Sequence, residues 1–259
     1  MKAKDFVRRI FLTEYVDKGG SVDRIITDNA DREVERVATC MVITPDVLRE
    51  AIEWGAHLIV THEPTYHKDA EEFFEYKPYI TKRELLEKHN IAVCRWHDSP
   101  HYGDVDDVSA SLVNRMSWKG RFDGKFIFEF DEPLSPLQIA RDIRDNMGIA
   151  HPRIVGCRDG LVKKVSIQLG QRGVNTYLDM LHNDVDLLIS GETCEWYCCE
   201  PIRDMSQVGM QKTIIIIGHA GSERLAMEDL ANRINRELSN ECGVVAKYFD
   251  CGELYSYID

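Results

Sequence analysis

The chain has 259 residues, enough for one large domain or two modest ones, and its 44% apolar and 29% charged residues exclude a disordered protein. The formal net charge of −12 argues against a nucleic-acid partner, and no apolar run approaches the roughly 18 to 20 residues of a membrane span. Charges interrupt the apolar residues of positions 1–16, which predicts an amphipathic helix with Phe6 and Ile10 on one face rather than a signal peptide. We therefore expect a cytoplasmic protein.

Helices and strands are expected to alternate along most of the chain, which predicts an α/β fold. The expected strands are 34–44, 57–61, 91–96, 124–133, 153–157, 165–169, 186–190, 213–218 and 244–249. The expected helices after the first are 45–55, 77–89, 106–117, 135–147, one between 169 and 186, and 222–239. A polar stretch at 119–123 indicates a domain boundary. We predict a first α/β domain from 1–122 plus 213–259, with 123–212 inserted as a second α/β domain.

Three of the apolar strands end in a histidine that is followed by further potential metal ligands. The segments HLIVTHEP, IAVCRWHDSPH and TIIIIGHAGSE supply His62, Glu63, His97, Asp98, His101, His219 and Glu223. In open α/β sheets, ligands bind beyond the carboxyl ends of the strands. We therefore expect these side chains to be presented to one place.

Six of these side chains, all but Asp98, form a set of four imidazoles and two carboxylates. That is more than one tetrahedral zinc ion needs, and it suits two divalent ions per chain, zinc, iron, manganese or nickel, that share a bridging hydroxide. A single strand-end histidine is more often an ordinary hydrogen-bonded residue, so a metal-free α/β domain stays open as an alternative. The remaining histidines are expected to be structural or to face solvent: His57, His67, His89, His151 and His182.

The eight cysteines are scattered through predicted strands and helices, and a chain of this length does not need disulfides for stability. We expect free thiols. A redox or metal role is the alternative for the cluster Cys194, Cys198 and Cys199, which lacks a second cysteine pair at zinc-ribbon spacing.

The same segments resemble the Nif-three-like family, many of whose members carry the name type-two GTP cyclohydrolase I. AIEWGAHLIVTHEP resembles the family's stretch ending in Thr-His-His-Pro, and IAVCRWHDSPH its strand ending in His with an Asp four residues later. VSIQLGQRGVN through DLLISGE resembles its glycine-rich loop and Thr-Gly-Asp or Thr-Gly-Glu turn. IIIIGHAGSE resembles the closing Gly-His-x-x-Ser-Glu motif, which is the most specific piece.

The resemblance implies two interleaved α/β domains with mixed sheets, a dinuclear metal site in the cleft between them, and a homo-oligomer, often a hexamer. Two of the six ligand positions depart from the family pattern: Glu63 stands where a second His is usual, and His101 where Asp is usual. These changes are reciprocal, so four imidazoles and two carboxylates remain. Two further departures, Val42 for an Asp and Trp196 for a His, imply a different substrate or loss of the usual chemistry.

The leading hypothesis on function is hydrolysis of a small polar substrate, such as a nucleotide, by a metal-bridging hydroxide. Glu192, which ends the segment DLLISGE, is the candidate proton-transfer group, with an exposed turn carboxylate as the alternative. Gly170, Arg172 and Gly173 of the loop LGQRGVN could hold an anionic group or form an ordinary turn. A metal-binding regulatory or scaffold protein without turnover is the alternative function.

Overall fold

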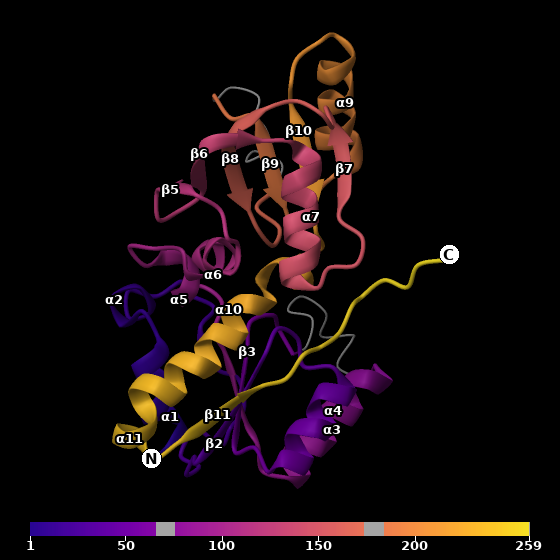
Figure 1. Cartoon of the computed structure of the whole chain (residues 1–259). Coiled ribbons are helices and arrows are strands. Elements are labelled where there is room, and N and C mark those ends of the chain that lie inside the picture. The colour runs from indigo at the N-terminus through magenta and orange to yellow at the C-terminus, as the bar shows by residue number, and fades with distance from the viewer. Residues whose placement is uncertain (66–75, 174–183, 259) are drawn as a thin grey trace. The chain divides into compact units, whose positions relative to one another are not determined.

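The computed structural model describes residues 1–65, 76–173 and 184–258 (Figure 1). It divides into two compact units, one formed by Met1–Gly103 with Ala226–Asp259 and the other by Asp104–Leu225. The positions of the chain's parts relative to one another are not determined, so each unit is described by itself. Because both ends of the chain build the first unit, the two α/β units are interleaved in sequence, as predicted.

The first unit is built on a five-stranded mixed sheet with the order β1-β4-β3-β2-β11. Its strands are β1 (Arg24–Ile25), β2 (Arg36–Cys40), β3 (Leu58–Thr61), β4 (Ala92–Arg95) and β11 (Val245–Tyr248). All neighbours pair in parallel except β1, which pairs antiparallel with β4. The carboxyl ends of β2, β3 and β4 therefore lie along one edge of this sheet.

The central strands of this sheet carry apolar residues on both sides, as expected for a sheet whose two faces are both buried. In β3, Leu58 and Val60 join a core cluster with residues of the N-terminal helix, whereas Ile59 joins a second cluster with residues of the helices before β3 and β4. The helices of this unit are α1 (Ala3–Ile10), α2 (Thr13–Val16), α3 (Pro45–Trp54), α4 (Lys77–Lys88), α5 (Ser99–Tyr102), the later part of α10 (His219–Arg233), the π-helical turn η3 (Ile234–Leu238) and α11 (Ser239–Cys242). Helices α3 and α4 pack against each other (Figure 1).

The second unit is built on a six-stranded mixed sheet with the order β5-β6-β8-β9-β10-β7. Its strands are β5 (Gly120–Phe122), β6 (Ile127–Leu134), β7 (Arg153–Gly156), β8 (Val162–Gln168), β9 (Leu187–Ser190) and β10 (Thr213–Ile216). The central strands β8, β9 and β10 are parallel, and the flanking pairs are antiparallel. Its helices are α6 (Asp107–Arg115), α7 (Pro136–Met147), the π-helical turn η2 (Glu195–Cys199), α9 (Glu200–Gln207) and the start of α10.

The structure confirms two helix predictions in detail, including the residues at which each helix begins and ends. Helix α3 begins where Thr44 Oγ1 accepts a hydrogen bond from the Val47 amide, and it ends at Gly55 with a left-handed φ of 80°. Helix α7 begins with a capping box at Ser135 and ends at Gly148, also left-handed. The α/β class and the two mixed sheets are confirmed.

Other expectations need correction or lie outside the described residues. The amphipathic helix expected at the N-terminus is confirmed as α1, which buries Phe6 and Ile10; it ends at Ile10, and the short helix α2 follows from Thr13. The helix expected between residues 169 and 186 falls on 174–183, which the structure does not describe, as do His67 and His182. The units also place residues 104–122 and 213–225 with the middle of the chain, because β5 and β10 hydrogen-bond within the second sheet.

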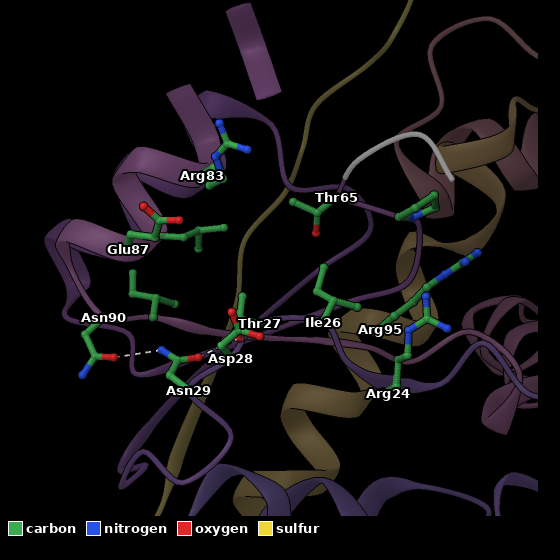
Figure 2. Close-up of a pocket in the computed structure, with 13 residues that line it drawn as sticks. Arg24, Ile26, Thr27, Asp28, Asn29, Thr65, Arg83, Glu87, Asn90 and Arg95 are labelled. Carbon is green, nitrogen blue, oxygen red and sulfur yellow. Dashed lines mark hydrogen bonds between the residues drawn. The ribbon is translucent and has the colours of Figure 1, made fainter. Parts of the chain in front are cut away.

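Two further features bear on function. No helix among the described residues combines the length and apolar character needed to cross a membrane. A pocket opens in the first unit, lined by residues of β1, α4, the end of β4 and the segment that follows β3 (Figure 2).

Candidate metal centre

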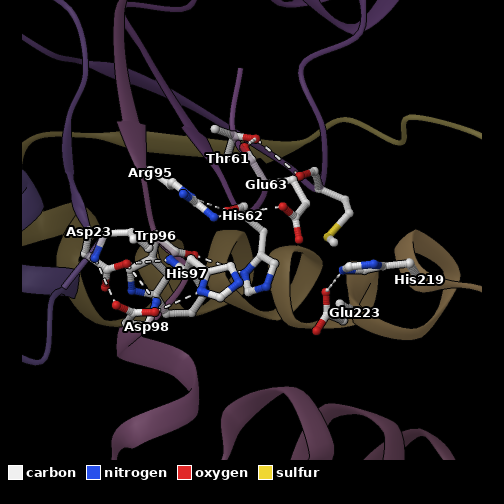
Figure 3. Close-up of polar contacts among 12 residues, drawn as sticks. Asp23, Thr61, His62, Glu63, Arg95, Trp96, His97, Asp98, His219 and Glu223 are labelled. Atoms are coloured by element: carbon white, nitrogen blue, oxygen red, sulfur yellow. Dashed lines mark hydrogen bonds and ion pairs between the residues drawn. The ribbon is translucent and has the colours of Figure 1, made fainter. Parts of the chain in front are cut away.

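Three histidines of the first unit gather at the carboxyl edge of its sheet, and Figure 3 shows two of them, His62 and His97. His62 follows β3, His97 follows β4, and His101 lies in the short helix α5. The rings of His62 and His97 stack with centroids 4.6 Å apart, and His101 stands edge-on to both at 5.4 and 5.5 Å. One ring nitrogen from each lies within 4.8 Å of the others. We call these three residues the imidazole cluster.

The strand pairing explains why residues 35 positions apart meet here. Thr61 pairs with Arg95 in the parallel β3·β4 register, so the two chains leave the sheet side by side and turn at the same edge. The sequence alone predicted this convergence of His62 with His97. Helix α5 starts at Ser99, shortly after β4 ends at Arg95, and returns His101 to the same place.

Hydrogen bonds orient two of these rings. His62 Nδ1 lies 3.1 Å from the carbonyl oxygen of Trp96, and His97 Nδ1 lies 2.9 Å from Asp98 Oδ1. Both partners are acceptors, which favours the tautomer with the proton on Nδ1 and the lone pair on Nε2. A carboxylate or carbonyl on the far nitrogen is the usual arrangement behind a metal-binding histidine.

The segment that carries His97 is anchored by the buried carboxylate of Asp23. Asp23 Oδ1 accepts from the amides of His97 and Asp98 at 2.6 and 2.7 Å, and Oδ2 accepts from the amide of Ser99 at 2.7 Å and from its hydroxyl. Asp98 in turn accepts from Ser21 Oγ and the Val22 amide. The strand end is therefore held in place by two carboxylates before any ligand binds.

The electrostatics around His97 favour neutral imidazole, the form that binds metal. Burial lowers the pKa of His97, and the neighbouring His62 lowers it further, while the hydrogen bond with Asp98 acts in the opposite direction. Burial alone would raise the pKa of Asp98, but hydrogen bonds from His97, Val22 and Ser21 lower it. Asp98 is therefore ionised near neutral pH and His97 is not.

Glu63 lies next to the imidazole cluster and faces an arginine. Its Oε2 is 3.9 Å from Arg95 Nη2, a long ion pair, and its backbone is tied to Thr61 and Met41. A carboxylate oxygen of Glu63 also lies within 4.8 Å of a ring nitrogen of His62. Glu63 is thus placed beside the cluster as the sequence predicts.

In the second unit, His219 and Glu223 form a pair one turn apart at the start of α10. His219 Nε2 is 3.2 Å from Glu223 Oε2, and His219 Nδ1 is 3.0 Å from Glu192 Oε2 (Figure 3 shows the first contact). Two ligands of one tetrahedral ion with bonds of about 2.1 Å lie roughly 3.4 Å apart, so this spacing suits a shared cation. We call His219 and Glu223 the His219 pair, and Glu192 lies behind its imidazole.

Two glycines make room for the His219 pair. A Cβ on Gly170 would come within 2.7 Å of the Glu223 Cδ, and Gly170 has a φ of +65°. A Cβ on Gly191 would come within 2.6 Å of the Gly170 amide nitrogen. Ser222 Oγ accepts from the Gly170 amide and donates to the His219 carbonyl, and Ser222 lies inside the first turn of α10, which starts three residues before the helix expected at 222–239. The glycine-rich loop serves this close packing.

The donor chemistry of both groups fits divalent metal ions. Neutral imidazoles oriented through Nδ1 suit zinc, iron, manganese or nickel, and the His219 pair adds one imidazole and one carboxylate. Within the first unit, His62, His97 and His101, with Glu63 beside them, could hold an ion. Within the second unit, His219 and Glu223 could hold one, with Glu192 orienting the ring.

The model of the family described as Duf34/NIF3 (NGG1p interacting factor 3) matches residues 4–250. The chain belongs to this family. A similar relative is a protein of Clostridium perfringens named GTP cyclohydrolase 1 type 2 homolog, 24% identical over 93% of this chain and 94% of the relative. NIF3-like protein 1 of Drosophila melanogaster is 22% identical over 92% of this chain and 82% of its own length. The crystal structure of Staphylococcus aureus hypothetical protein SA1388 has a TM-score of 0.80 at 19% identity, covering 100% of this chain and 99% of that one.

The positions at which this Duf34/NIF3 chain departs from the pattern quoted above lie in different surroundings. Val42 is half-buried in the turn between β2 and α3, and its carbonyl accepts from the Thr44 amide. Trp196 is 73% exposed and stacks edge-on against Tyr197. Neither position adds a ligand to the clusters described above.

The sequence hypothesis that Arg172 holds an anionic ligand is not supported by its surroundings. Arg172 Nη2 is 2.9 Å from the carboxylate of Asp106, which is fully buried, and its guanidinium lies 4.7 Å from the ring centre of Phe126. A buried carboxylate needs a cation close to it. Arg172 therefore neutralises Asp106 at the start of α6.

Some residues of this site have no signal in the sequence. Asp23 lies more than seventy residues from the segment that it anchors, and nothing in the sequence around it distinguishes it from the other aspartates of the chain. Asp98 stood among the strand-end residues, but its role behind His97 was not predicted. The eight cysteines are all free, and burial raises the pKa of Cys198 to about 11, so this thiol is unreactive at neutral pH.

Proposed function

We propose that this Duf34/NIF3 chain is a metal-dependent hydrolase that binds two divalent ions and acts on a small polar substrate. The imidazole cluster and the His219 pair supply the ligands, with Glu63 beside the first and Glu192 behind the second. The number of two ions per chain comes from the six predicted ligands and from the family resemblance.

The imidazole cluster is the observation that carries this function. Three imidazoles with ring nitrogens within 4.8 Å of one another are an unfavourable arrangement for protonated rings, since like charges would repel. The contacts of His62 Nδ1 with the Trp96 carbonyl and of His97 Nδ1 with Asp98 leave Nε2 of each ring to bind a metal, and burial lowers the pKa of His97. This arrangement favours a role in metal binding over a role in packing the core.

Bound divalent ions would supply Lewis acidity and would lower the pKa of the water bound to them to near neutral. The residues of the chain have the complementary tasks. His62 and His97 are held rigid by Trp96 and Asp98, which fixes the position at which a substrate atom is polarised. Glu192 is 59% exposed and contacts His219 Nδ1, so it can accept a proton and pass it to solvent.

The substrate class is inferred from a name and from charge. The Clostridium perfringens relative is named as a GTP cyclohydrolase homologue, at 24% identity. We propose a small polar molecule, such as a nucleotide, rather than a nucleic acid, because the chain carries a net charge of −12. The predicted homo-hexamer remains a prediction that light scattering on the purified chain would test.

Hydrolysis of a substrate panel tests this function. We would assay GTP, other nucleoside triphosphates and small cyclic amides with protein loaded with zinc, manganese, iron or nickel, and with chelator-treated protein. We expect turnover only in a loaded form, and we expect Glu192→Gln to lower kcat by about 100-fold when it is reloaded to the metal content of wild type. If kcat at equal metal content is unchanged in Glu192→Gln, Glu192 only orients His219 and does not transfer protons.

The alternative is a metal-binding regulatory protein without turnover, and one observation favours it. Trp196 is 73% exposed, and exposed tryptophans are enriched where proteins bind one another. Metal-loaded protein that turns nothing over, yet binds a partner only when loaded and not as Trp196→Ala, would support this role and contradict the hydrolase.

A further inference from the structure

The pocket of the first unit has the size and lining of a small-molecule site. Its volume is about 640 Å³, within the range of roughly 300 to 1,000 Å³ that is usual for such sites. Apolar side chains of Ile26, Leu86 and Ile91 line part of it. Asn29 and Asn90 line it too, joined by a hydrogen bond of 2.9 Å from Nδ2 to Oδ1 (Figure 2).

Three arginines also line this pocket, in a chain that is acidic overall. Arg24 comes from β1, Arg95 from the end of β4 and Arg83 from α4. Figure 2 shows Arg24 and Arg95 close together at one end of the pocket, and Arg83 beside Glu87 at the other. The carboxylates of Asp28 and Glu87 line the pocket as well, but neither lies within 4.0 Å of a guanidinium in the part of the chain that is described.

Arg24 and Arg95 are directly opposite each other in the antiparallel β1·β4 pair. Side chains at opposed positions lie on the same face of the sheet with Cβ atoms about 5 Å apart, and like charges there are destabilising. An anion between the two guanidinium groups would turn this repulsion into attraction. A repulsive pair at the end of a pocket is therefore a specific signal for an anionic ligand.

The existing partners leave this charge largely uncompensated. Arg95 is only 16% exposed, and its nearest carboxylate, that of Glu63, is 3.9 Å away. Its Nε donates to the His62 carbonyl at 3.4 Å, which orients the guanidinium without neutralising it. Arg24 makes no ion pair or side-chain hydrogen bond with any described residue, and it is exposed to the pocket mouth.

We propose that the pocket binds an oxyanion group, a phosphate or a carboxylate, of a small molecule between Arg24 and Arg95. The planar guanidinium presents paired N–H donors that match two oxygens of such a group. The apolar side chains and the Asn29–Asn90 pair would hold the rest of the molecule. This site stands whether or not the chain is a hydrolase, because it needs no metal.

Calorimetric titration of chelator-treated protein tests this site apart from metal binding. The probes are inorganic phosphate, pyrophosphate and succinate at low salt, and the variants are Arg24→Gln, Arg83→Gln and, as a matched control, Arg49→Gln. Arg49 lies on the exposed side of α3 in the same unit and pairs with Asp46. Tight phosphate or pyrophosphate binding would identify a phosphate group, and preferential succinate binding a carboxylate.

We expect binding to weaken by about tenfold or more in Arg24→Gln, since a charge-assisted hydrogen bond is lost, and by less than threefold in Arg83→Gln. Arg49→Gln should bind as wild type does. Without anion, Arg24→Gln should be at least as heat-stable as wild type, because a like-charge contact is removed. No binding of any probe below about 10 mM, or equal binding by Arg24→Gln and Arg49→Gln, would overturn the site.

Discussion

The imidazole cluster of the first unit and the His219 pair of the second present similar ligands but are supported by different means. The first depends on polar contacts: buried carboxylates of Asp23 and Asp98 hold the segment after β4. The second depends on space: Gly170 and Gly191, which follow β8 and β9, let the first turn of α10 approach these two strand ends. The comparison teaches that the same strand-end histidine can be positioned by charge or by the absence of side chains.

Of the substitutions that compare the two groups, Asp23→Asn should cause the largest loss of folding stability. The asparagine amide would face the two Ser99 donors that now reach Asp23 Oδ2, so a buried acceptor is replaced by a donor. We expect a loss of about 3 kcal/mol in the free energy of unfolding. Urea unfolding of chelator-treated protein measures it, with Asp46→Asn on the surface as the control. A loss below about 0.5 kcal/mol, typical of surface positions, would show that Asp23 does not anchor the segment.

Asp98→Asn compares the two histidine supports directly. Loss of a carboxylate behind a metal-binding histidine typically weakens metal binding by about 10- to 100-fold. We expect Asp98→Asn to approach that range and Glu192→Gln to have a smaller effect, because Glu192 is 59% exposed and water can replace it. Competition with a chromophoric chelator measures both. Equal effects would mean that burial of the support is irrelevant.

Gly170→Ala tests the role of space in the second unit, and Gly173→Ala is its matched control. Both glycines have left-handed φ values, +65° and +80°, so both alanines share a backbone strain of about 1 kcal/mol or more. Only the Gly170 methyl would meet Glu223, whereas nothing lies within 4 Å of a Cβ on Gly173 among the residues described. We expect Gly170→Ala to cost about 1 to 3 kcal/mol more in unfolding free energy and to weaken metal binding. Identical behaviour of the two variants would contradict the account.

His57→Gln should have the smallest effect on stability, because His57 lies outside both the imidazole cluster and the His219 pair. Its Nδ1 accepts from the Glu35 amide, and burial, followed by the charge of Arg32, lowers its pKa from 6.5. A lowered pKa in the folded state means that its contribution to stability is complete above pH 6.5 and is lost as pH falls through the folded pKa. We expect His57→Gln to flatten the decline in stability of chelator-treated protein between pH 7 and pH 5. An unchanged slope would show that the ring titrates as it does in the unfolded chain.

The contrast between the units also explains which residues of the candidate site could be predicted from the sequence. The positions of His62 and His97 follow from short apolar runs, because the parallel neighbours β3 and β4 end at one edge of a sheet. The expectation that the strand before His219 ends at the same edge is wrong, because β10 pairs within the second sheet. Asp23, by contrast, acts through contacts across more than seventy residues, and β1 is too short to show a pattern. The opposition of Arg24 and Arg95 depends on that same short strand and its register. The ion pair of Arg172 could not be predicted, because its partner Asp106 lies on a distant segment.

Metal content per chain, measured by elemental analysis, tests the central claim that the two groups are metal ligands. We would compare wild type with His97→Ala and His219→Ala, and with the matched surface variants His89→Ala and His151→Ala, after reloading with zinc, manganese, iron or nickel. We predict close to two ions in wild type and in both surface variants, and a loss of metal in His97→Ala and in His219→Ala. Wild type that holds little of any metal after reloading would contradict the claim and leave only the fold.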